Sequence, residues 1–158
     1  MEDMCVPCGN GILNVRVGAI IMKNGKLLMV GNERADYLYS VGGRIKMGET
    51  AEEAIVREVM EETGVRMEID RLGFVHENYF HGDSPEKSGR LVYELSFYFY
   101  MKVPLGFEPI CQSFAEGETK EYLHWVNPAE ARKIFPAFFK TELQPSVRYV
   151  RHLVNDER

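Results

Sequence analysis

Two glutamates spaced one helical turn apart, Glu58 and Glu62, are the feature of this sequence that most directly suggests chemistry. A helix advances about 100° per residue, so these carboxylates share one face and Glu61 lies beside them. The same face carries the apolar residues Ala51 and Ile55 and should therefore pack inward. Like charges at this spacing cost roughly 0.2–0.5 kcal/mol even on an exposed helix, and burial adds to that cost. A divalent cation removes the conflict, because carboxylate oxygens are hard ligands that suit Mg²⁺, Mn²⁺ or Ca²⁺.

An acidic helix is more often a solvated surface than a metal site, so the glutamates alone leave both interpretations open. The spacing of the other residues around these glutamates favours the metal site. Residues 43–65 read Gly-x5-Glu-x7-Arg-Glu-U-x-Glu-Glu-x-Gly-U, where U is aliphatic and is filled by Val59 and Val65. This segment resembles the Nudix box at every fixed position, and the resemblance to the MutT-like Nudix family extends from about Asn14 to Phe139.

The resemblance implies both a fold and an activity. The fold is α/β, of the α+β type, with a mixed β-sheet held between helices in an α/β/α sandwich. The activity is Mg²⁺-dependent hydrolysis of the phosphoanhydride of a nucleoside diphosphate linked to a second group, with Mn²⁺ as an alternative cofactor. The ion would neutralise the diphosphate and lower the pKa of the attacking water.

The resemblance also assigns residues of the box by position. The expected metal ligands are Glu58, Glu62, Glu61 and the carbonyl oxygen of Gly43. Glu49 and Arg57 are expected to form a structural pair that orients the metal-binding turn and so contributes to catalysis.

The general base, which accepts a proton from the attacking water, is less closely defined. In some members of the family it is a box glutamate, here Glu61, and in others it lies in a later loop. Three acids precede Trp125 at suitable distances, and each is individually also consistent with a plain surface acid: Glu116, Glu118 and Glu121. Glu121 is the favoured candidate among them.

Substrate contacts are expected from residues next to the box and on neighbouring strands, namely Arg16, Glu77, Tyr79 and Arg44. The positions that distinguish substrates in the family, around residues 80–83, match no known signature. ADP-ribose or another nucleotide sugar and a modified nucleoside triphosphate therefore both stay open. The alternative function is a non-catalytic Nudix-like module that senses a nucleotide, although such modules usually lose box glutamates that this chain keeps.

Local patterns predict the elements that must position these residues. Thr50 and Glu53 form a capping box at the start of a helix over residues 50–63, and Gly64 stops it. Asn24-Gly25 is a hairpin signal. A second helix is expected from Asn127 to about residue 134, and the tail beyond residue 136 is expected to be helical. Strands are expected over residues 14–22, 26–31, 37–45, 65–80, 91–103 and 120–126, with loops over 81–90 and 104–119.

The 158 residues are predicted to form a flexible leader over 1–13 and a single Nudix domain over 14–158. A net charge of −5 without a dense basic cluster argues against a nucleic-acid partner. No signal peptide or membrane span is recognisable, and three cysteines do not suggest a disulfide framework, so a cytoplasmic location is expected. The expected partner is a small-molecule nucleotide. Dimerisation is common in the family, which leaves a homodimer open.

Overall fold

The computed structural model describes residues 1–85, 87–110, 113–116, 119–129 and 133–158, with the backbone alone described at 113–116 and 119. Its elements in chain order are β1 (Cys5–Cys8), β2 (Gly11–Ile20), β3 (Met22–Lys23), β4 (Lys26–Asn32), β5 (Leu38–Arg44), α1 (Ala51–Thr63), β6 (Glu68–His81), β7 (Leu91–Lys102), β8 (Ser113–Glu116), β9 (Thr119–Val126), β10 (Ile134–Phe135), the 3-10 helix η1 (Ala137–Lys140) and β11 (Arg151–Asp156).

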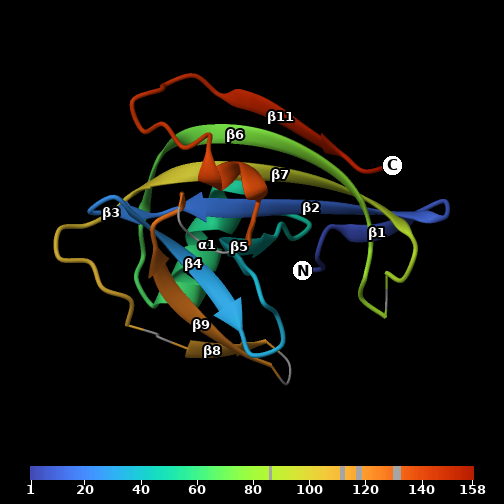
Figure 1. Ribbon diagram of the computed structural model, residues 1–158, viewed down its shortest axis with the longest axis horizontal. Coiled ribbons are helices and arrows are strands. Elements are labelled where there is room, and N and C mark those ends of the chain that lie inside the picture. Colours follow the sequence, from blue (N-terminus) through green and yellow to red (C-terminus); the bar gives the residue numbers. More distant parts are fainter. Residues whose placement is uncertain (86, 111–112, 117–118, 130–132) are drawn as a thin grey trace.

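The strands form one mixed sheet in the order β11-β6-β7-β2-β5-β4-β9-β8 (Figure 1). Strands β2 and β7 are parallel, as are β6 and β11, whereas the pairs β2/β5, β4/β5, β4/β9 and β6/β7 are antiparallel. The short strands β1, β10 and β3 pair with β2, β5 and β4 respectively. Strand β2 therefore lies near the middle of the sheet, with β5 beside it carrying the start of the box.

Helix α1 covers one face of the sheet and begins and ends where local chemistry predicts. The Thr50 side chain accepts a hydrogen bond from the Glu53 amide, the Glu53 side chain accepts one from the Thr50 amide, and Gly64 closes the helix with φ 76°. Its buried residues Ile55 and Val59 pack against the sheet in one hydrophobic cluster. Within the described residues, no helix is long and apolar enough to cross a membrane.

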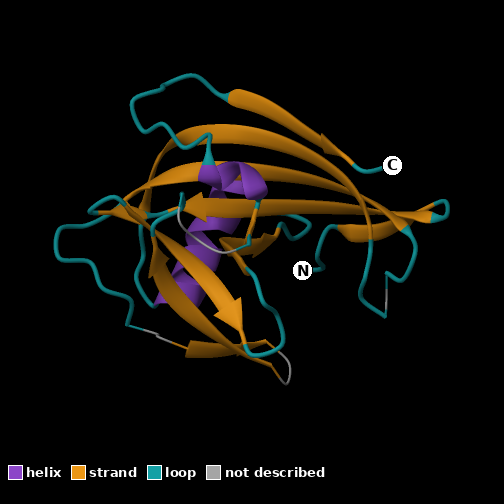
Figure 2. Ribbon diagram, viewed as in Figure 1, coloured by secondary structure: helices purple, strands orange, loops and turns teal. Residues whose placement is uncertain are grey.

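The opposite face of the sheet is covered by η1 and the segments around it, which lie in front of β2 and β7 in Figures 1 and 2, with α1 behind. Phe139 is 1% exposed, and the Phe138 ring lies 4.8 Å from the Phe74 ring and 5.4 Å from the Tyr98 ring. A second hydrophobic cluster thus forms on this side. The prediction of a mixed sheet between helical layers is confirmed, with a four-residue 3-10 helix in the second layer.

The first residues of the chain join the sheet, although they were expected to form a loose leader. Cys5–Cys8 form β1, which pairs antiparallel with β2 from Cys5↔Asn14 to Cys8↔Gly11. This register leaves Gly9-Asn10 as a two-residue hairpin turn, with Gly9 at φ 58°. The Gly-Asn-Gly run was the sequence signal for this hairpin.

Three expectations for the second half of the chain are wrong. Residues 113–116 form β8, paired with β9, where a loop was expected. Part of the expected helix, residues 130–132, lies outside the described residues, but Ile134–Phe135 form a strand parallel to β5. The tail is not helical beyond η1, because residues 151–156 pair with the edge of β6 as β11. In each case hydrogen bonding to a distant strand overrides the local pattern.

Candidate functional site

Glu58 and Gly43 lie in direct contact, and the absence of a side chain at Gly43 makes this contact feasible. A Cβ atom built at Gly43 would lie 2.4 Å from Oε1 of Glu58. Strand β5 therefore brings backbone to the carboxylate at a distance that no other residue would allow. The predicted carbonyl ligand and the first glutamate ligand are brought together by the packing of α1 on β5.

Glu62 lies one turn further along α1 and is only 8% exposed. Its Oε1 accepts a long hydrogen bond of 3.4 Å from the Gly42 amide, and its Oε2 is buried without a hydrogen-bond partner. Burial, with a further contribution from the charge of Glu58, raises the pKa of Glu62 to about 9. Burial also raises the pKa of Glu58, against the opposing effect of Arg57. The ionised pair is thus unfavourable unless a positive charge joins it.

Arg57 links the helix to the loop that leads into it. Its Nε and Nη2 donate to the two carboxylate oxygens of Glu49 at 2.6 and 2.9 Å, and Nη2 also donates to the Arg44 carbonyl at 3.2 Å. Hydrogen bonding from Arg57 lowers the pKa of Glu49 to about 2, with help from the Lys46 amide. This two-pronged geometry fixes the turn from residue 44 to residue 49 against α1.

The third box glutamate, Glu61, is placed differently from the other two. Its side chain is 55% exposed and forms an ion pair with Arg57 at 3.3 Å. Arg57 also pairs with Glu58 at 2.7 Å. Glu61 therefore lies at the outer rim of the site, reaching the same guanidinium from the solvent side.

Glu121 belongs to β9, which β4 separates from β5 in the sheet. It is 6% exposed and accepts a hydrogen bond from the Tyr39 hydroxyl. Its negative charge adds to the shift that burial and Glu58 impose on the pKa of Glu62, which places it in the same electrostatic cluster. Of the other candidates for the base, Glu118 lies outside the described residues and Glu116 is described in its backbone only.

Tyr39 was missed by sequence reasoning. Burial raises its pKa above the ordinary value, and hydrogen bonding to Glu121 raises it further, so the phenol stays protonated and donates. The signal available in the sequence was the alternation of residues along β5, which places every second side chain on the same face as Gly43. Tyr39, Val41 and Gly43 occur at every second position, and Val41 is fully buried beneath α1.

The donor set fits a divalent cation, although the described residues contain no group of three or more His, Cys, Asp or Glu side chains already converged on one point. The decisive observation is the orphaned, buried Oε2 of Glu62. A buried carboxylate oxygen without a donor calls for a positive partner. Glu58 and the backbone of Gly43 supply further oxygen atoms beside it, and oxygen donors are the ligands that Mg²⁺ prefers.

The predicted substrate contacts divide into two groups. Arg16 on β2 pairs across the strands with Arg44 on β5, and its positive charge acts on both Glu58 and Glu62. Glu77 and Tyr79 lie elsewhere, on β6, which β7 separates from β2. There Glu77 accepts a hydrogen bond from the Tyr93 hydroxyl at 2.8 Å and contacts His152 at 2.6 Å. The ring of Tyr79 packs on Tyr93, 4.8 Å between centroids.

Comparison with known proteins adds a family and several similar folds. The family model described as NUDIX domain matches residues 13–148. A MutT-like protein from Streptomyces ambofaciens is 35% identical over 65 residues, which cover 41% of this chain and 42% of that protein's length.

Two solved structures illustrate the structural likeness. An ADP-ribose pyrophosphatase from Streptococcus suis has a TM-score of 0.58 at 16% identity, covering 89% of this chain and 98% of that one. A MutT NUDIX hydrolase from Burkholderia pseudomallei has a TM-score of 0.51 at 23% identity, covering 77% of this chain and 88% of that one. At these identities the likeness concerns the fold.

Proposed function

Since the chain belongs to the NUDIX domain family of hydrolases, we propose that it hydrolyses the phosphoanhydride of a nucleoside diphosphate linked to a second group. The reaction uses Mg²⁺, with Mn²⁺ as an alternative. The observation that carries this proposal is the buried, orphaned carboxylate oxygen of Glu62 next to Glu58 and Gly43. A buried carboxylate oxygen without a partner destabilises a hydrophobic interior, so its presence there needs an explanation. Binding of a metal ion that in turn binds a diphosphate supplies that explanation.

In the proposed mechanism, Glu58, Glu62 and the carbonyl oxygen of Gly43 hold the ion, and Glu61 completes the site from the rim. When bound, Mg²⁺ supplies charge neutralisation for the diphosphate and a lowered pKa for the attacking water. Arg57 holds Glu58 and, through Glu49, the turn that carries Gly43.

We assign the general base to Glu121. Its carboxylate accepts a hydrogen bond from the Tyr39 hydroxyl, which fixes its position, and an ionised carboxylate can accept a proton from water. Its electrostatic coupling to Glu62 supports a position beside the ion rather than at the surface. Glu61 is the alternative base, since it is exposed to solvent at the rim of the same site.

Two substrate classes remain candidates, ADP-ribose or a related nucleotide sugar and a modified nucleoside triphosphate. Arg16 supports either class, because its positive charge acts on Glu58 and Glu62 near the site that an anionic substrate must approach on a protein of net charge −5, and Arg44 is its cross-strand neighbour. The small-molecule partner is thus recognised by charge close to the metal site.

The test is release of phosphate or nucleotide from a panel of nucleoside diphosphate derivatives and triphosphates, with Mg²⁺ and with EDTA. Glu62→Gln keeps the shape of the side chain and removes its charge, so turnover should be lost. Glu52→Gln, an exposed acid in the first turn of the same helix, is the matched control and should keep wild-type turnover. Tight binding of a nucleotide without turnover of any compound would instead support the sensing module.

A further inference from the structure

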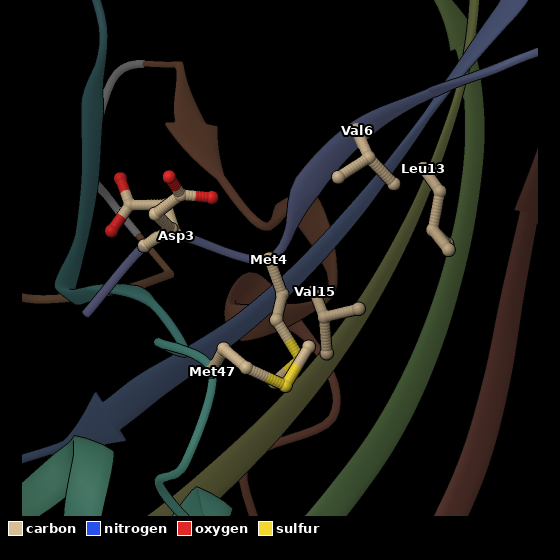
Figure 3. Close-up of a pocket in the computed structure, with 7 residues that line it drawn as sticks. Asp3, Met4, Val6, Leu13, Val15 and Met47 are labelled. Atoms are coloured by element: carbon tan, nitrogen blue, oxygen red, sulfur yellow. The ribbon is translucent and has the colours of Figure 1, made fainter.

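Two cavities flank β1, and they differ sharply in character. The first has a volume of about 260 Å³ and is lined mainly by the apolar residues Met4, Val6, Leu13, Val15 and Met47, with Glu2 and Asp3 at its margin. Figure 3 shows Met4, Val15 and Met47 converging and Val6 facing Leu13, while Asp3 points away from them. Nothing in this cavity selects a ligand of particular chemistry.

The second cavity has a volume of about 300 Å³ and contains a local excess of positive charge. Its lining comprises three cations, one acid and several smaller or apolar residues: Arg44, Lys87, Arg90, Asp3, Cys5, Val6, Pro7 and Ile12. The chain as a whole carries −5, so a concave site whose described lining has three cations and one acid runs against its average. Such a cavity is suited to an anion.

Backbone carbonyl groups hold one of the cations, Arg90, in place without neutralising it. Arg90 donates from Nε to the Asn10 carbonyl at 3.1 Å and from Nη2 to the Gly11 carbonyl at 2.9 Å. Lys87 is positioned by a compact loop, in which a Cβ at Gly82 would lie 2.3 Å from the Cβ of Lys87. Carbonyl groups carry no net charge, so the positive charge of Arg90 stays available to a ligand.

The third cation connects this cavity to the reaction centre. Arg44 directly follows Gly43 in β5, its carbonyl accepts a hydrogen bond from Arg57, and its side chain forms a long ion pair with Asp3 at 3.5 Å. Arg16 is its cross-strand partner. Arg44 thus both lines this cavity and directly follows Gly43, the residue that contacts Glu58.

We propose that the second cavity binds a phosphate group on the part of the substrate that is linked to the nucleoside diphosphate, so that the preferred substrate class has a phosphorylated second group. This inference rests on the proposed function and deepens it. Arginine offers paired, planar donors to phosphate oxygens, and lysine offers a compact charge.

The first test compares a substrate pair, ADP-ribose and ADP-ribose phosphorylated on its terminal ribose. The wild-type protein should favour the phosphorylated compound. Lys87→Gln should raise its KM roughly tenfold, the loss expected for one charged hydrogen bond, with kcat unchanged and with both constants for ADP-ribose unchanged. Lys102→Gln removes an exposed lysine at the opposite end of β7 and should change neither substrate. Equal effects of Lys87→Gln on the two compounds, or none, would overturn the inference.

The second test does not depend on turnover. Inorganic phosphate is titrated into the metal-free protein while backbone amide shifts are followed by NMR. Shifts at residues 44, 87 and 90 that weaken in Lys87→Gln but persist in Lys102→Gln are expected. Absence of shifts there would overturn the site. If phosphate binds while the substrate pair shows no Lys87-dependent preference, the cavity binds free phosphate and the substrate assignment is wrong. Failure of all hydrolysis with these shifts intact would count against the proposed function alone.

Discussion

Glu62 lies on the buried side of α1, and one of its carboxylate oxygens has no hydrogen-bond partner among the described residues. A buried, unsatisfied charge of this kind opposes folding, because water solvates it better in the unfolded chain. The same oxygen is what makes the site suitable for a cation. Stability of the metal-free protein and affinity for metal should therefore respond in opposite directions to a change at this residue.

Glu62→Gln is accordingly expected to stabilise the metal-free protein at pH 8, by roughly 1–3 kcal/mol, because folding at this pH forces Glu62 to keep a proton that it releases in the unfolded chain, whereas glutamine carries no such cost. Urea unfolding in EDTA measures this. Glu52→Gln should leave the unfolding free energy almost unchanged, because that side chain is exposed. A lower stability for Glu62→Gln in EDTA would mean that the carboxylate is already well compensated without a cation.

At the scale of elements, α1 is the part of the fold that local sequence determines most completely. Its capping box and Gly64 terminus were predicted and are present. Thr50→Ala should lower the free energy of unfolding by about 1 kcal/mol, because it leaves the Glu53 amide without its acceptor. Thr141→Ala, at an exposed position without a helix N-cap role, is the control. If both substitutions cost the same in urea unfolding, the capping box makes no special contribution.

Other elements could not be read from sequence because their pairing is remote. The segment at Ile134 carried a proline-initiated helix pattern, yet its backbone pairs with β5 nearly a hundred residues earlier. Strand β11 likewise follows from the open edge of β6 rather than from alternation in its own residues. Both cases show tertiary hydrogen bonding overriding a local preference.

The candidate site likewise combines residues that the local sequence groups together with residues that only the tertiary fold brings near them. Glu58, Glu62, Arg57 and Glu49 come from one continuous segment, so their spacing sufficed to group them. The Tyr39–Glu121 hydrogen bond joins residues 82 positions apart and depends on the order β5-β4-β9. Glu77 was grouped with the site by family position, but β6 places its carboxylate beside Tyr93 and His152 instead.

For the whole molecule, the buried glutamates should make stability depend jointly on pH and metal. The pKa of Glu62 is raised to about 9 from an ordinary 4.5, so the folded state keeps a proton that the unfolded chain releases. Stability conferred by this group is full below 4.5 and is lost as pH rises toward 9. The contribution of Glu49 to stability has the opposite pH dependence and is lost as the pH falls. Because the pKa of Glu49 is about 2, this loss is confined to acid pH. The lowered pKa of His76 acts mainly below pH 6.5.

The melting temperature in EDTA should therefore fall between pH 7 and pH 9, and Mg²⁺ should raise it more at pH 9 than at pH 7. Mg²⁺ binds the ionised carboxylates of the folded state and so removes the cost that grows with pH. Differential scanning calorimetry at a fixed protein concentration gives both values, with Glu62→Gln as the variant that should lose the trend. An Mg²⁺ effect that is the same at both pH values would contradict this linkage.

Homodimerisation stays a prediction.

Gly43 and Arg44 are neighbours in β5, yet the first meets Glu58 on one face of the sheet and the second pairs with Arg16 on the other. Arg44, which lines the proposed phosphate cavity, and Gly43, which contacts Glu58, thus lie on opposite faces of one strand. Under the proposed assignment, a mutation at Lys87 or Arg90 would change the preferred ligand while the reaction centre stays untouched. Such an arrangement lets a lineage diversify its specificity by small steps, each of which leaves a working catalyst.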